Sequence, residues 1–145
     1  MNNTELAYLA GFLDGEGCIH IVSTKGQAGF KNLRYRLRIH ITNTDKGVMD
    51  WLKQFGFYIR ELKKLKKHWK QCWRADLCDT KARLLLEQLL PYLIVKKDET
   101  LLAIEFQTHK EKVGTSNGSK GMSEEEIEYR ERTKKQLSEL KEQKI

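Results

Sequence analysis

The nine residues Leu9–Gly17, which read LAGFLDGEG, constrain the fold more than any other part of the chain. At about 100° per residue, the positions in and just before this stretch predict a helix that is apolar on two opposite sides. One side is formed by Leu6, Leu9, Ala10 and Leu13. The other is formed by Tyr8, Gly11, Phe12 and Gly15. Such a helix needs two packing surfaces, one from the core of this chain and one from elsewhere.

The glycines of this stretch indicate a close contact with another helix, and its acids indicate a bound cation. Gly11 and Gly15, four residues apart, leave no side chains to hold a partner helix away. Glycines inside a helix cost about 1 kcal/mol each relative to alanine, and a close helix contact would offset that cost. Asp14 and Glu16 lie where the helix is expected to end, where carboxylates are disfavoured by its partial negative charge. A bound cation would relieve that conflict. The alternative is an ordinary helix end with exposed acids.

The composition fits one folded domain. The chain has 145 residues, 39% of them hydrophobic and 32% charged, which suffices for a core of its own. We expect a domain over residues 1–113, a flexible Gly- and Ser-rich linker over 114–122, and a charged helix over 123–145. Ser123 and Glu126 form a capping box for that helix. The helix either packs on the domain or is mobile.

Targeting signals and cysteine spacing are also informative. No apolar run approaches the roughly 20 residues of a membrane span, and the N-terminus does not read as a secretion signal. We therefore expect an intracellular protein without membrane partners. Cys18, Cys72 and Cys78 form neither an even disulfide framework nor a zinc-type pair. We expect reduced thiols, and no Cys/His metal site that uses His20 or His40.

Positive charge is concentrated in the body of the chain. The net charge is +7, while residues 123–145 hold seven acids and six bases. Residues 1–122 therefore carry about +8, which suggests a polyanionic partner. The positions of these charges on the expected strands indicate the binding partner more clearly than the net charge does.

After Gly17 the hydrophobic period changes to two, which predicts strands. The first is expected over Cys18–Lys25, with Ile19 and Ile21 toward the core and His20, Val22 and Thr24 away from it. After a turn at residues 26–29, the second strand has a core face of Tyr35, Leu37, Ile39 and Ile41. Its other face carries Arg34, Arg36, Arg38 and His40. The first strand has no acid to balance these arginines. An edge strand charged against aggregation is the alternative, but contact with phosphates and base edges explains the pattern better.

The middle of the chain extends the basic surface. A helix over Lys46–Gln54, capped by Thr44 or Asp45, is followed by two expected strands, Phe57–Lys67 and Trp69–Leu77. Residues 60–74 contain seven Lys or Arg and one acid, a density that suits phosphate contacts. The side chains expected to face the polyanion are Tyr58, Arg60, Lys64, Lys70 and Arg74, with Lys67 in the turn between the strands.

The remaining pattern completes an α+β fold. Asp79 or Thr80 is expected to cap a helix that runs to Leu90, and a further helix follows Pro91–Lys97. The predicted order is αββαββα followed by further helices. It gives an antiparallel four-stranded sheet with helices on one face and the other face bare.

Two segments carry a resemblance to a known family. LAGFLDGEG resembles the motif of the LAGLIDADG homing endonucleases, with Glu16 in place of the usual second Asp. Pro91–Lys97 resembles the segment that holds the basic active-site residue in that family. The chain has one motif copy, and single-motif members are homodimers whose motif helices pack together. The resemblance implies that the bare sheet face forms a saddle over double-stranded DNA. It also implies a dimer interface of Tyr8, Gly11, Phe12 and Gly15.

The resemblance further implies a site-specific, metal-dependent DNA endonuclease whose staggered cut leaves 3′ overhangs. Glu16 and the Gly17 carbonyl would hold Mg²⁺, or another divalent cation such as Mn²⁺. Lys96, or Lys97 as the alternative, would stabilise charge or help to activate water. Asn43 matches a polar position that organises solvent, and Asp14 has a supporting part. The implied DNA contacts are His20, Thr24, Arg34, Arg36, Arg38, His40, Tyr58, Arg60, Lys64, Lys67, Lys70 and Arg74.

Two other functions use the same scaffold. One is a maturase that binds intron RNA during splicing, and the other is a sequence-specific DNA-binding regulator without cleavage. An acid at Glu16 and a lysine at Lys96 favour cleavage over both. The expected location is the cytoplasm or the organelle that contains the target DNA.

Overall fold

The computed structural model describes residues 2–26, 29–114 and 122–143. The helices and strands are α1 (Asn3–Glu16), β1 (Gly17–Gly26), β2 (Gly29–Asn43), α2 (Lys46–Leu52), β3 (Tyr58–Glu61), β4 (Trp73–Cys78), α3 (Asp79–Leu89), α4 (Lys97–Val113) and α5 (Glu124–Glu142). Short 3-10 turns follow α2 and α3, namely η1 (Lys53–Phe55) and η2 (Leu90–Tyr92). The expected αββαββα order is confirmed. Residues 27–28 of the expected turn and 115–121 of the expected linker lie outside the described residues.

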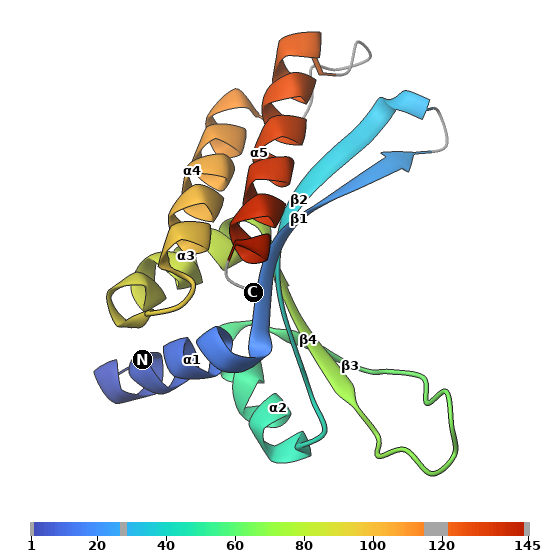
Figure 1. The fold of residues 1–145 in the computed structure, drawn as a ribbon, viewed down its shortest axis with the longest axis vertical. Coiled ribbons are helices and arrows are strands. Elements are labelled where there is room, and N and C mark those ends of the chain that lie inside the picture. The colour runs from blue at the N-terminus through green and yellow to red at the C-terminus, as the bar shows by residue number, and fades with distance from the viewer. Residues whose placement is uncertain (1, 27–28, 115–121, 144–145) are drawn as a thin grey trace.

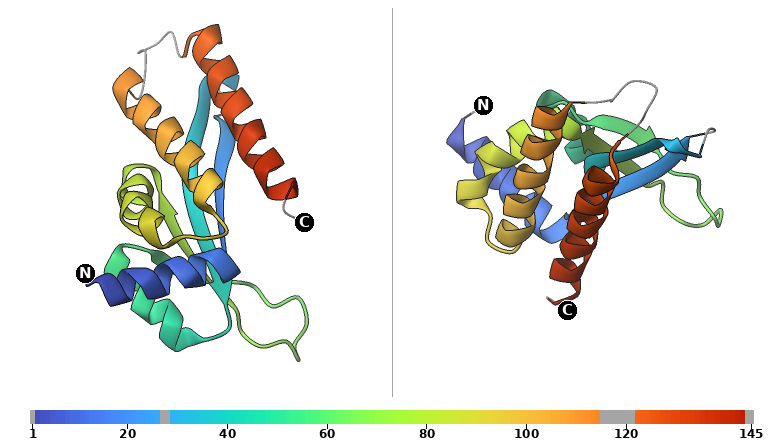
Figure 2. Two further views of the ribbon diagram at one scale, coloured as in Figure 1. Left: turned by 60° about the vertical axis from the view of Figure 1, so that its left-hand side comes forward. Right: turned by 90° about the horizontal axis from the view of Figure 1, so that it is seen from above.

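The strands form one antiparallel sheet in the order β1-β2-β4-β3. In Figure 1 the helices lie to the left of the sheet. In Figure 1 the β1–β2 hairpin and the β3–β4 connection extend to the right, at opposite ends of a concave face. In the view from above in Figure 2 both again point to the right, away from α1 and α3. The expected covered face and bare face are therefore both present.

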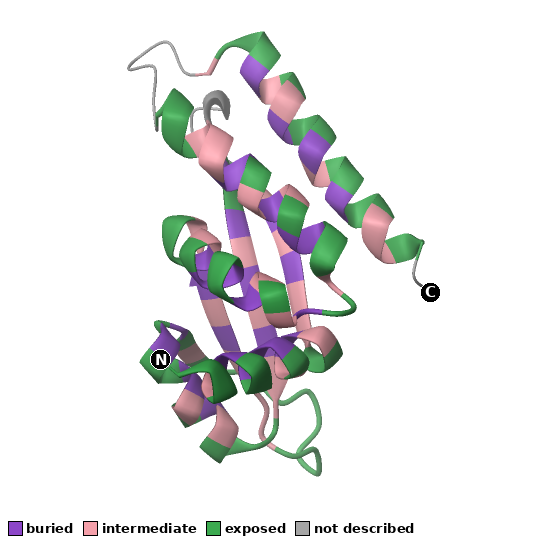
Figure 3. Cartoon of the chain, turned by 90° about the vertical axis from the view of Figure 1, so that its left-hand side faces the viewer, coloured by how far each residue is buried: buried purple, intermediate pink, exposed green. Residues whose placement is uncertain are grey.

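The core lies between the sheet and the helices, as the alternation of apolar residues predicts. Ile19, Leu37, Ile39, Ile41 and Ala75 are all fully buried. Along each central strand, buried residues alternate with more exposed ones in Figure 3. The helices contribute a second set to the core, which includes Leu9, Ala10, Leu13, Ala82, Leu86, Leu89 and Phe106.

The third and fourth strands are shorter than expected. β3 ends at Glu61 and β4 begins at Trp73, so Lys64, Lys67 and Lys70 lie in an exposed connection and not on strands. This connection also holds Lys63 and Lys66. Like charges facing one another across a hairpin are unfavourable, which explains why the regular pairing stops early.

Two expected caps also differ from the structure. α3 begins at Asp79, but its N-cap residue is Cys78, without a side-chain capping bond. The Asp79 carboxylate instead pairs with Arg36 and Lys110. At α5, Ser123 does accept a hydrogen bond from the Glu126 amide, whereas the Glu126 carboxylate turns away to His109 and Arg130. Both acids serve long-range contacts that sequence spacing does not reveal.

The charged C-terminal helix packs on the domain. Leu137 of α5 belongs to the core, and Glu126, Arg130 and Thr133 are buried with it. Tyr35 of β2 donates a 2.6 Å hydrogen bond to Glu131. Among the described residues, no helix has both the length and the apolar character needed to cross a membrane.

Candidate nucleic-acid interface and metal site

The C-terminal end of α1 presents an acid that no neighbour holds. Glu16 is exposed and makes no hydrogen bond or ion pair with the part of the chain that the structure describes. Gly17 follows and turns the chain directly into β1. A Cβ atom at Gly17 would come within 2.9 Å of the Leu13 carbonyl oxygen, so any larger residue would disturb this turn. The glycine therefore fixes where the Glu16 carboxylate leaves the helix.

Asp14 joins this helix end to a distant segment. Its carboxylate accepts hydrogen bonds from the backbone amides of Ile94, Val95 and Lys96, at 2.8, 3.1 and 3.0 Å. Lys96 returns a bond from its Nζ to the Asp14 carbonyl oxygen at 2.8 Å. We name this arrangement, Asp14 with Ile94–Lys96, the acid clamp. Of the two candidate lysines, the clamp brings Lys96 to the motif, whereas Lys97 is exposed at the start of α4.

The end of α1 suits a hard divalent cation. The Glu16 carboxylate and the Gly17 carbonyl are oxygen donors, which Mg²⁺ and Ca²⁺ prefer. The negative end of the α1 dipole adds to their attraction for a cation. Two oxygen donors do not complete the coordination of such an ion. Water, substrate phosphate or a second copy of the chain has to supply the others.

Asn43 has a local role in the structure. Its Oδ1 atom accepts a 2.8 Å bond from the amide of Asp45, the residue that caps α2. Gly17 pairs with Ile41, so Asn43 lies at the end of the sheet where α1 meets β1. Its expected part in organising solvent stays a prediction.

The strand register collects the expected DNA contacts on one face. Residues paired directly across antiparallel strands point to the same side. Thr24 pairs with Arg34, His20 with Arg38, and Arg60 with Arg74. The face opposite the core therefore holds, among others, His20, Thr24, Arg34, Arg36, Arg38, His40, Tyr58, Arg60 and Arg74. We name it the basic face.

Two acids absent from the predicted basic face, Asp76 and Asp79, pair with its arginines. Asp76 of β4 pairs with Arg74 at 2.9 Å and with Arg60 at 3.6 Å. Asp79 pairs with Arg36 at 3.0 Å. Asp76 alternates in phase with Arg74 along β4, so the strand pattern places this acid on the basic face. These pairs hold three guanidinium groups in place and offset part of their charge.

Arg38 is the exception among these arginines. Its Nε atom is buried and has no hydrogen-bond partner in the described structure. A buried donor without a partner costs about 1–3 kcal/mol unless a ligand satisfies it. It lines a hollow of about 790 Å³ whose wall also includes Arg36, Tyr58, Arg60, Asp76 and Lys81.

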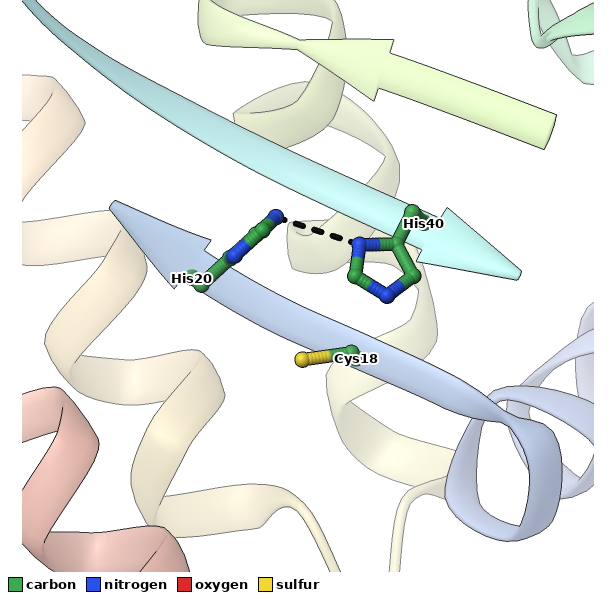
Figure 4. Close-up of side chains that lie close together, drawn as sticks. All are labelled: Cys18, His20 and His40. Carbon is green, nitrogen blue, oxygen red and sulfur yellow. Dashed lines mark hydrogen bonds between the residues drawn. The ribbon is translucent and has the colours of Figure 1, made fainter. Parts of the chain in front are cut away.

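His20 and His40 lie side by side next to Arg38. His20 Nε2 and His40 Nδ1 are 3.1 Å apart (Figure 4). Burial lowers the pKa of His20 to about 4, and the charges of His40 and Lys141 add to the effect. Burial, and next the charge of Arg74, lower the pKa of His40 as well. Both rings are therefore neutral at neutral pH, and each offers one hydrogen-bond donor and one acceptor.

The outer side of α1 is open and apolar. A Cβ atom at Gly11 or Gly15 would have no atom of the chain within 4 Å. Tyr8 is 58% exposed and contacts the ring of Trp51 edge-on, with centroids 5.2 Å apart. Phe12 stacks against Tyr8. Of the four residues of the expected dimer interface, Tyr8, Gly11 and Gly15 are thus exposed, while Phe12 is half-buried against the core.

The protein has an α+β fold in which one sheet face is bare and basic. Beside that face lie the exposed carboxylate of Glu16 and the ammonium group of Lys96, which is bonded to Asp14. This arrangement defines a nucleic-acid-binding protein with a candidate hydrolytic centre. Residues 9–111 match the family model of the LAGLIDADG endonucleases. The chain belongs to that family. The comparison with curated proteins gave no match.

Solved structures of homing endonucleases share the fold. The homing endonuclease I-CvuI, in complex with the I-CreI target, has a TM-score of 0.73 and 19% identity, and the match covers 94% of this chain and 82% of that one. The archaeal intron-encoded enzyme I-Vdi141I, complexed with DNA, has a TM-score of 0.72 and 16% identity, with 95% and 84% covered. The homing endonuclease I-TnaI has a TM-score of 0.56 and 15% identity, with 93% and 97% covered.

Proposed function

We propose that this chain is a site-specific endonuclease that binds double-stranded DNA across the basic face and hydrolyses both strands as a homodimer. The observation that carries the proposal is the exposed, partner-free carboxylate of Glu16, next to the clamp that positions Lys96. Both residues sit at the sheet end of α1, within a family of endonucleases. The implied cut is staggered, with 3′ overhangs.

The chemistry divides between a cation and the chain. We propose that Glu16 and the Gly17 carbonyl hold a divalent cation, Mg²⁺ or Mn²⁺. When bound, such an ion neutralises charge on the scissile phosphate and lowers the pKa of a coordinated water. Lys96 offers an ammonium group to the negative charge that develops on the phosphate. Asn43 is proposed to orient solvent. Among the similar proteins, I-CvuI was solved with DNA in the presence of Mg and of Ca.

The dimer follows from the uncovered side of α1. One chain contributes a single Glu16, whereas a cut through both strands needs two centres. We propose that two copies pack through Tyr8, Gly11, Phe12 and Gly15, with the glycines allowing close approach. The two basic faces then form one continuous saddle over DNA, over a target of roughly palindromic sequence.

Target recognition divides between two groups of residues. On the basic face, Arg38 and the neutral His20–His40 pair offer donors and acceptors to base edges. Lys64, Lys67 and Lys70 in the β3–β4 connection are suited to phosphates, which position the DNA without reading its sequence. We propose the same domain division as the sequence indicates, with 1–113 as the endonuclease domain. The alternatives remain a maturase on intron RNA and a non-cleaving regulator.

The deciding experiment replaces Glu16 by Gln. This change keeps the size of the side chain and removes the charge that would hold the cation. On the uninterrupted host sequence at the gene's insertion site, we expect cleavage to fall by at least about a thousandfold, with binding retained in a gel shift. Glu61→Gln, the same change at another exposed acid, is the control and should cut normally. Near-normal cleavage by Glu16→Gln refutes the assignment. Tight binding by wild type without any cleavage would support the regulator or the maturase.

A further inference from the structure

A second group of possible metal ligands lies on the basic face. Cys18 and His20 are two residues apart on β1, and Cys18 pairs directly with His40 on β2. One ligand atom from each lies within 4.8 Å of the other two. Within residues 2–26, 29–114 and 122–143, this is the only group of three or more His, Cys, Asp or Glu side chains that is close enough to hold an ion. Figure 4 shows the three side chains gathered over the two strands.

The sheet itself sets the spacing of these atoms. Positions two apart on one strand, and the residue opposite, share a face. His20 Nε2 and His40 Nδ1 are 3.1 Å apart. Two nitrogens on a tetrahedral ion with Zn–N bonds of about 2.0–2.1 Å would be about 3.3 Å apart. The two nitrogens therefore need to move little to bind one metal ion in place of the hydrogen bond between them.

We propose that Cys18, His20 and His40 form a binding site for a thiophilic transition-metal ion of the Zn²⁺ type, separate from the carboxylate site at Glu16. Two imidazole nitrogens and one sulfur suit Zn²⁺, Co²⁺ or Cu²⁺, and are poor ligands for Mg²⁺. Three protein ligands leave one tetrahedral position for solvent. This proposal departs from the sequence-based expectation of no Cys/His metal site, because the three ligands come from two strands and not from one short motif.

The surroundings modify the site without removing its ligands. Lys141 of α5 donates a hydrogen bond from Nζ to Cys18 Sγ at 3.2 Å. Arg74 lies 3.3 Å from His40 Nδ1, the atom that would turn to the metal. Ion binding must displace this contact. Positive neighbours oppose a dication, so we expect weaker binding than at a closed four-ligand zinc site.

A metal ion bound at this site would prevent His20 and His40 from contacting DNA. Under the proposed function these two rings face base edges. A bound ion would occupy His20 Nε2 and His40 Nδ1 and fix the orientation of both rings. Zn²⁺ should therefore weaken binding to the target, whereas Mg²⁺ at the separate carboxylate site should not have this effect.

The site is tested with Co²⁺, because the absorption spectrum of bound Co²⁺ shows whether a thiolate is among its ligands. Wild type should bind one Co²⁺ per chain, with a near-ultraviolet thiolate-to-cobalt absorption band that Zn²⁺ removes. Cys18→Ser should lose the band and weaken Zn²⁺ binding by at least about tenfold in calorimetry. Cys72→Ser is the matched control, because Cys72 lies outside the group, and it should keep both signals. His40→Gln should lose affinity as well. Circular dichroism confirms that each variant is folded.

The proposal is overturned if wild type gives no thiolate band, or if Cys18→Ser binds Zn²⁺ as wild type does. It is also overturned if Cys72→Ser loses the band. These readouts need no DNA, so they stand or fall independently of the endonuclease assignment. In a gel shift, Zn²⁺ should weaken target binding by wild type and not by Cys18→Ser. Equal weakening of both would show that the ion acts elsewhere.

Discussion

Two acids two residues apart have opposite surroundings. Asp14 accepts three backbone hydrogen bonds, while Glu16 has no partner among the described residues. A carboxylate that accepts several amide bonds is tied to the fold. An exposed carboxylate that accepts none can be replaced without loss of stability. The sequence distinguishes them only through the resemblance, because both follow a leucine-rich helix and both adjoin glycine.

Asp14→Asn and Glu16→Gln make the same chemical change in these two settings. Asp14→Asn leaves an amide NH₂ facing backbone donors, and should lower the free energy of unfolding by about 2 kcal/mol, or the melting temperature by about 6 °C. Glu16→Gln should leave both unchanged. Calorimetry on the two proteins checks this. Equal melting temperatures would show that the acid clamp contributes nothing to stability.

The arginines of the basic face differ in how freely they can read DNA. Arg36 is held by Asp79, whereas the buried Nε of Arg38 has no partner among the described residues. Arg38→Ala should therefore relax preference at particular base pairs, at a cost of about 1–3 kcal/mol on the specific site. Lys67→Ala should weaken all sequences alike and lower the salt slope by about one unit. Binding titrations on specific and random DNA at several salt concentrations distinguish them. Equal losses on both DNAs for Arg38→Ala would contradict base readout.

At the scale of elements, regular periodicity predicted well and long-range charge did not. α1, β1, β2, α2 and α3 lie where their apolar periods place them, because each buries one face against the same core. The β3–β4 pair is shorter than predicted, and the largely exposed residues 62–72 between its strands hold five lysines. Repulsion among like charges disfavours a longer ladder there. The distant partners of Asp76, Asp79 and Glu126, such as Arg60, Arg36 and His109, are set by tertiary packing, which local spacing does not encode.

The open side of α1 permits a sharp test of dimerisation. A leucine at Gly15 meets no atom of its own chain within 4 Å of its Cβ, so the monomer fold should be kept. A tight helix contact, in contrast, loses about 1–3 kcal/mol per overpacked site, and a symmetric dimer has two such sites. Gly15→Leu should therefore sediment as a folded monomer at micromolar concentration. Gln88→Leu adds a leucine to an exposed position of α3 and should remain dimeric. A dimeric Gly15→Leu protein would refute this packing.

At the scale of the whole molecule, α5 is attached by Leu137 in the core and by polar contacts with α4 and β2. Glu126, 9% exposed, binds Arg130 at 2.7 Å and His109 of α4 at 2.9 Å. Burial alone would raise the pKa of Glu126, but the hydrogen bonds from His109 and Arg130 outweigh it, and the pKa lies below its ordinary value. Because the folded state depresses this pKa, the interaction stabilises the protein at neutral pH and is lost as the carboxylate takes up a proton.

Glu126→Gln should therefore destabilise the protein by about 3 kcal/mol at pH 7, since Arg130 is left buried without its counter-charge. The deficit should shrink as the pH falls below about 4.5, where the carboxylate of the unfolded chain begins to take up protons, and disappear once the pH falls below the lowered pKa of the folded state. Urea unfolding over a pH series measures the difference. Glu125→Gln, at the exposed neighbouring position, should match wild type throughout. A deficit that is constant down to pH 3 would exclude titration of Glu126 as the cause.

The acid clamp also bears on the order in which a newly made chain becomes active. It joins backbone groups 80 to 82 residues apart, while α1 and the β1–β2 hairpin form from neighbours in sequence. Contacts across so long a loop form late. On the ribosome, a growing chain that has reached the end of β2 already carries Glu16 and the basic-face residues Arg34, Arg36 and Arg38, yet it lacks Lys96 and the amides that hold Asp14. Under the proposed function, incomplete chains would thus bind DNA without hydrolysing it. Cleavage of the host's DNA would then have to wait until translation has reached Lys96.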